Sequence, residues 1–118
     1  MSSQKPNVVR EKSFAFALRI IKVAQFLQDE KREFVLSKQI LRSGTAIGAL
    51  IREAEHAQSR PDFINKMNIA LKEANETDYW IELLYQAELI TKTSYDELQP
   101  ACKELVRLLA AIVKTTKS

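Results

Sequence analysis

The chain has 118 residues, a formal net charge of +3, and a composition that is 46% hydrophobic and 28% charged. These values exclude an intrinsically disordered chain and fit a single domain with one core. Only two glycines and three prolines occur, too few for the many tight turns of a β-sandwich or barrel, so we expect an all-α protein.

The sequence also predicts the compartment. The single cysteine, Cys102, cannot form an internal disulfide, which favours a reducing environment. The segment Met1 to Pro6 lacks the apolar region of a signal peptide, and no apolar run has the length of a membrane span. We therefore expect a cytoplasmic protein with no membrane contact.

The chain begins with a segment that shows no helical periodicity. We expect residues 1–9, which include Pro6, to form a flexible N-terminal arm, and residues 10–118 to form one domain. Ser13 is suited to cap a first helix that ends near Glu30.

This first helix has more apolar surface than a bundle requires. Its apolar residues spread over about 200° of the helix, whereas a bundle helix needs a stripe only slightly wider than about 100°. They are Phe14, Ala17, Leu18, Ile20, Ile21, Val23, Ala24 and Leu27. Phe26 lies beyond this arc, beside Arg19 and Lys22, so we infer apolar surface left over for a partner.

A second helix is predicted from about Phe34 to Ala57. Its apolar face comprises Leu36, Ile40, Ile47, Leu50, Ile51 and Ala54. Both glycines, Gly44 and Gly48, lie inside this helix, where each costs about 1 kcal/mol relative to alanine. With Ser37 they form a stripe of small residues about 40° wide. This stripe predicts the close approach of another helix.

A third helix is predicted to begin after Ser59, a suitable N-cap, with Pro61 and Asp62 in its first turn, and to end near Ala87. Its core face comprises Phe63, Met67, Ala70, Leu71, Ala74, Ile81, Leu84 and Tyr85. A second apolar set points away from that face, interleaved with Glu73 and Glu76. It comprises Ile69, Tyr79, Trp80 and Leu83.

A fourth helix is predicted from the capping-box pair Ser94 and Glu97 to about Thr115. Its core face comprises Leu98, Ala101, Leu105, Leu108, Leu109 and Ile112, and a basic stripe of Lys103, Arg107, Lys114 and Lys117 lies opposite. Four helices with short connectors favour antiparallel neighbours, so we expect an antiparallel up-down four-helix bundle.

The sequence contains no convincing catalytic or metal constellation. Glu53 and His56 have the Glu-x-x-His spacing of di-iron bundles, but His56 is the only histidine and both residues lie opposite the core face. Cys102 sits at the flank of an apolar face, as expected for a buried structural thiol. We therefore expect no enzyme activity, no cofactor and no metal, and no small-molecule substrate is evident.

Two surfaces are candidates for binding. Trp and Tyr are enriched at interfaces, and the carboxylates of the third helix can pair with Arg42 or Arg52. We predict an interface between copies of the chain, comprising Phe26, Arg42, Gly44, Gly48, Ile69, Glu73, Glu76, Tyr79, Trp80 and Leu83. The basic stripe of the fourth helix is suited to phosphate backbones; alternatively, it is a solvated face whose cations complement the helix dipole.

The segment from Ser37 to Ala49 resembles the signature of the four-helix-bundle proteins encoded in intervening sequences of bacterial 23S ribosomal RNA genes. The similarity continues through Glu53-Ala54, Ser59, Asp62-Phe63, Lys66, Ile69-Ala70, Lys72-Glu73-Ala74, Glu76-Thr77 and Tyr79-Trp80, and ends with Ile112-Val113-Lys114-Thr115. It covers nearly the whole chain. Leu50 stands where the family usually has asparagine and Ala46 where it has serine, which favours a packed seam over a polar network near the glycines.

The resemblance implies a four-helix bundle that assembles as a ring-like homopentamer, with a molecular function that is mostly unassigned. A distant branch serves as the accessory protein of diversity-generating retroelements, and nothing here matches that branch closely enough to carry over its function. We therefore expect a non-enzymatic oligomeric scaffold that binds RNA, DNA or a nucleoprotein. The alternative is a protein-binding adaptor that uses the surface around Trp80 and makes no nucleic-acid contact.

Overall fold

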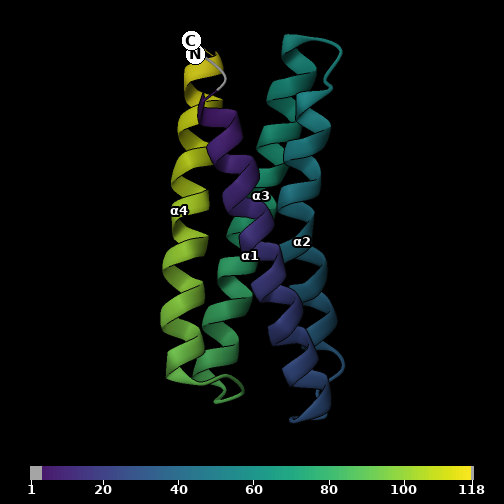
Figure 1. Ribbon diagram of the computed structural model, residues 1–118, viewed down its shortest axis with the longest axis vertical. Coiled ribbons are helices and arrows are strands. Elements are labelled where there is room, and N and C mark those ends of the chain that lie inside the picture. Colours follow the sequence, from purple (N-terminus) through teal and green to yellow (C-terminus); the bar gives the residue numbers. More distant parts are fainter. Residues whose placement is uncertain (1–3, 118) are drawn as a thin grey trace.

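The computed structural model describes the backbone of residues 4–117 and the side chains of residues 8–117. Four helices follow one another along the chain: α1 (Gln4–Asp29), α2 (Leu36–Glu55), α3 (Arg60–Gln86) and α4 (Lys92–Lys117). Consecutive helices run in opposite directions, and α1 crosses in front of α3 (Figure 1). The predicted all-α bundle is confirmed for the described residues, which contain no strand.

The core lies along the axis of an elongated body of 44 × 22 × 19 Å. The predicted core faces of α2, α3 and α4 are largely confirmed, since each supplies fully buried side chains such as Ile47, Ile81 and Leu105. In α1 the buried side chains are Val9, Phe16, Ile20, Ala24 and Leu27. Val9 was not predicted because it was placed in the N-terminal arm, and Phe16 was not predicted because the broad apolar arc of α1 has no unique inward direction.

The first helix begins earlier than expected. It already includes Gln4, although a flexible arm was predicted over residues 1–9, of which residues 1–3 lie outside the described part. The buried Val9 anchors this N-terminal turn to the core. Ser13 does not cap the helix; its hydroxyl donates to the carbonyl of Arg10 at 3.0 Å inside it.

Side-chain caps set the start of α3 and α4. Ser59 caps α3 as predicted, because its hydroxyl accepts from the Asp62 amide at 3.2 Å. The predicted cap at Ser94 is wrong: α4 begins at Lys92, and the Thr91 hydroxyl accepts from the Ser94 amide at 3.1 Å.

The two glycines of α2 lie against α1 of the same chain. A Cβ atom at Gly44 would be 2.8 Å from Cγ1 of Ile20, and one at Gly48 would be 3.4 Å from Oγ of Ser13. The predicted close approach is therefore real, but it forms the α1–α2 contact. Gly44 is buried there, which corrects the expectation that it lies between copies.

Candidate functional site

The exposed large apolar side chains concentrate on α1. Among the described residues they are Val8, Phe14, Leu18, Ile21 and Phe26 on α1, Phe34 and Val35 in the connector to α2, and Tyr79 on α3. Phe14, Leu18 and Ile21 are 53%, 50% and 38% exposed, and their spacing of four and three residues places them on one face of the helix. We call these three residues the outer α1 stripe.

The stripe is flanked by a cation from the neighbouring helix. The guanidinium of Arg52 on α2 lies 5.3 Å from the centroid of the Phe14 ring. This contact leaves Phe14 more than half exposed. Exposed apolar side chains grouped on one helical face make the outer α1 stripe a candidate for contact with a partner.

A polar network joins α2 to α3. Arg42 donates to Glu73 at 3.1 Å and also to Glu76, and the indole of Trp80 donates to Glu76 at 3.0 Å. Hydrogen bonds from Trp80 and Arg42 lower the pKa of Glu76, and its carboxylate raises the pKa of Arg42. The predicted pairing of Arg42 with these carboxylates is confirmed, within one chain, while Arg52 turns to Phe14 instead.

The remaining residues of the predicted interface are divided between two places. Tyr79 is 58% exposed and meets the Trp80 ring edge-on at 5.0 Å, whereas Ile69, Trp80 and Leu83 are half-buried. They lie on α3 near the polar network. Phe26 lies apart from them, at the seam between α1 and α4.

The basic stripe of α4 is partly neutralised. Lys103 forms an ion pair with Asp78 of α3 at 3.1 Å. Arg107 is exposed, and Lys114 and Lys117 lie in the last turn of the helix. The cations therefore gather toward the C-terminal half of α4, where they also complement the helix dipole.

The described residues provide no group of three or more His, Cys, Asp or Glu side chains suited to a metal ion. Glu53 instead pairs with Lys66 at 3.0 Å. Cys102 is fully buried, as predicted, and its thiol donates to the carbonyl of Ala74 at 3.2 Å. Burial raises the pKa of Cys102 to about 12, which keeps the sulfur protonated and unsuited to nucleophilic attack. No described helix is long and apolar enough to cross a membrane.

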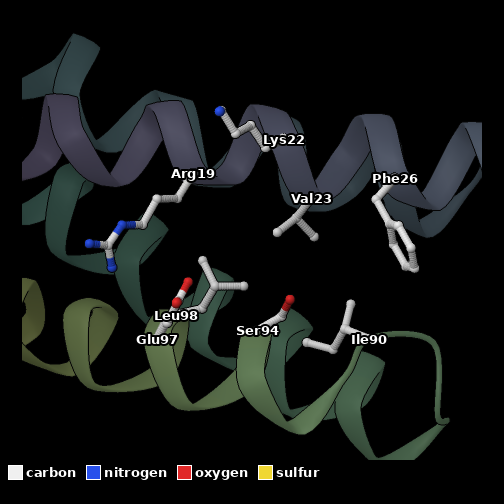
Figure 2. Close-up of a pocket in the computed structure, with 8 residues that line it drawn as sticks. All are labelled: Arg19, Lys22, Val23, Phe26, Ile90, Ser94, Glu97 and Leu98. Carbon is white, nitrogen blue, oxygen red and sulfur yellow. The ribbon is translucent and has the colours of Figure 1, made fainter.

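A groove follows the seam between α1 and α4, which diverge toward the C-terminal end of α1 (Figure 1). Its central cavity, of about 230 Å³, is lined by Arg19, Lys22, Val23, Phe26, Ile90, Ser94, Glu97 and Leu98 (Figure 2). A cavity of about 240 Å³ on one side shares Arg19, and one of about 310 Å³ on the other shares Phe26 and Ile90. We call these three neighbouring cavities together the seam groove. The sequence pattern did not predict this groove, although Phe26 beside Arg19 and Lys22 lies at its centre.

Comparison with known proteins supports the sequence resemblance. A family model described as 23S rRNA-intervening sequence protein matches residues 5–111. The crystal structure of a protein with unknown function from the S23 ribosomal protein family of Bacteroides thetaiotaomicron is 60% identical in sequence, with a TM-score of 0.91. The similarity covers 93% of this chain and 98% of that one. No curated protein shows significant similarity to the chain.

Proposed function

Because the chain belongs to the family of 23S rRNA-intervening sequence proteins, we propose that it is a non-enzymatic scaffold that assembles into a homopentameric ring by burying the outer α1 stripe. The observation that carries this proposal is the exposure of Phe14, Leu18 and Ile21 on one helical face. Covering the exposed parts of three such side chains contributes on the order of 2–4 kcal/mol per interface, before the costs of association.

A ring needs two different complementary faces on each copy, since a face that pairs with itself gives a closed dimer. The bundle offers two such faces. Among the described residues α2 and α4 each pack on both α1 and α3, so α1 and α3 occupy diagonal positions in the bundle. Their outer surfaces, the outer α1 stripe and the Tyr79 region, therefore point in different directions, which suits head-to-tail assembly.

Light scattering during size-exclusion chromatography tests the assembly. We expect a particle with five times the 13.5 kDa mass of one chain. A monomer at all concentrations contradicts the proposal. A dimer supports self-assembly but contradicts the ring.

The second part of the proposal is that the scaffold binds nucleic acid through the basic stripe of α4. Arg107 and Lys117 are exposed there, and a ring multiplies the formal charge of +3 per chain. Electrostatic binding of phosphates weakens as salt rises, with a slope of about −0.9 per contact on a duplex. A titration with RNA and DNA duplexes at several salt concentrations tests this part, and binding that is absent at low salt contradicts it.

The alternative function, a protein-binding adaptor, is favoured by one observation. Tyr79 is 58% exposed beside the half-buried Trp80. A monomeric protein that binds neither RNA nor DNA would favour this alternative over the scaffold.

A further inference from the structure

The seam groove combines an apolar floor with polar edges of different chemistry. Val23 and Phe26 from α1 and Leu98 and Ile90 from the opposite side point into the space between the helices (Figure 2). Phe26 is 38% exposed and separates the central cavity from the next one. The central cavity has a volume of about 230 Å³, and its apolar side chains can contact the face of a ligand.

Cations line the α1 edge of this groove. Arg19 and Lys22 border the central cavity, and Lys31 lies 5.9 Å from the centroid of the Phe26 ring. Among the described residues, Arg19 and Lys22 form no ion pair, whereas Lys12 at the far end of the groove pairs with Glu104 at 3.3 Å. The charge of Arg19, which extends toward α4, is therefore available to an anionic ligand, and Lys22 places a second cation on the outer side of α1 (Figure 2).

The α4 edge carries hydrogen-bonding groups instead. Ser94 directs its hydroxyl into the central cavity, and the carboxylate of Glu97 lies on the same edge (Figure 2). A carboxylate accepts hydrogen bonds and donates none. A ligand held there should present amino groups toward α4 and negative charge toward α1.

We propose that the seam groove binds single-stranded nucleic acid, with phosphates along Arg19 and Lys22, one base against Phe26 and a neighbouring base beside Glu97. Stacking on an aromatic side chain beside a cationic track is how proteins hold single strands. A duplex keeps its bases paired and stacked, so it cannot place one in this cavity. This inference rests on the nucleic-acid part of the proposed function and adds a second site, between α1 and α4, to the basic stripe on the outer face of α4.

The chemistry of Glu97 makes the proposal specific. A carboxylate accepts from the exocyclic amino group of cytosine, whereas uracil presents a carbonyl at the same position. The groove should therefore prefer oligocytidine to oligouridine of equal length. Glu97→Gln should abolish this preference, because an amide both accepts and donates.

Fluorescence anisotropy with labelled 12-mers of cytidine and uridine and with a duplex tests the proposal on the full chain. We expect oligocytidine to bind about fivefold more tightly than oligouridine, and Glu97→Gln to equalise the two. Phe26→Ala should weaken both about tenfold. Arg19→Gln and Lys22→Gln should each lower the salt slope by about 0.7. Circular dichroism and light scattering establish that each variant keeps the fold and assembly.

A matched substitution, Arg107→Gln on the outer face of α4, separates this site from the basic stripe. It should leave the cytidine preference unchanged. Binding that depends on Arg107 and ignores Phe26, Arg19 and Glu97 overturns the seam-groove proposal while retaining the proposed function. Absence of binding to every nucleic acid at low salt overturns both the seam-groove proposal and the proposed binding by the basic stripe. The proposed ring assembly is tested separately, by light scattering.

Discussion

Gly44 of α2 lies directly against Ile20 of α1, so closely that a Cβ atom at Gly44 would be 2.8 Å from Cγ1 of Ile20. Ile20 is fully buried and β-branched, and its side chain has little freedom to move aside. This contact determines the rotation of α1 about its axis. With Ile20 turned inward, Phe14, Leu18 and Ile21 are turned outward.

Substitution of the two glycines should have opposite effects. Gly44→Ala should lower the free energy of unfolding by about 1–3 kcal/mol, because the added methyl overpacks Ile20. Gly48→Ala is the matched control. Its Cβ meets Ser13 at an ordinary 3.4 Å, so improved helix propensity should raise stability by up to about 1 kcal/mol. Urea denaturation measures both, and equal effects would contradict the close approach at Gly44.

The pKa of Glu76 should respond to its hydrogen-bond donors. Hydrogen bonds from Trp80 and Arg42 hold this pKa below the usual value of 4.5, and the bond from Trp80 is the largest single cause. Because the folded pKa is the lower one, the network stabilises the fold above the unfolded value, and this contribution is lost as the pH falls through the folded value. We expect Trp80→Phe and Arg42→Gln each to raise the pKa of Glu76 toward 4.5. NMR titration of the side-chain carboxyl measures it, and an unchanged value in Trp80→Phe contradicts the network.

Cys102 should be inert in the folded protein. Burial raises the pKa of its thiol from 9.0 to about 12, so any contribution to stability is complete below pH 9 and declines as the pH rises toward 12. At pH 8 a thiol reagent should label the chain only after denaturation in guanidinium. Rapid labelling of the native protein would show that Cys102 is accessible, and so that α3 and α4 pack less tightly than described.

The sequence predicted α2 and α4 well, because their apolar residues occupy one narrow stripe. Ile47 and Leu109 are fully buried as expected. The Ser59 cap of α3 was likewise predictable, since a cap depends on local sequence alone.

The orientation of α1 was not predictable in the same way. Apolar residues cover so much of this helix that periodicity alone does not distinguish the buried Phe16 from the exposed Phe14. The contact of α1 with Gly44 fixes which side of the helix faces the core. That contact joins residues far apart in the sequence, so local sequence does not predict it. The seam groove also depends on tertiary structure, because it arises where α1 diverges from α4 (Figure 1).

The most direct test of the proposed assembly is the mass of Leu18→Glu by light scattering, compared with the wild type. Leu18 is half exposed at the centre of the outer α1 stripe, so a charge there should not disturb the core but should prevent its burial between copies. Ala110→Glu, on the exposed surface of α4, is the control. We expect the wild type and Ala110→Glu to remain oligomeric and Leu18→Glu to become a folded monomer. An oligomer of unchanged mass in Leu18→Glu would contradict assembly through this stripe.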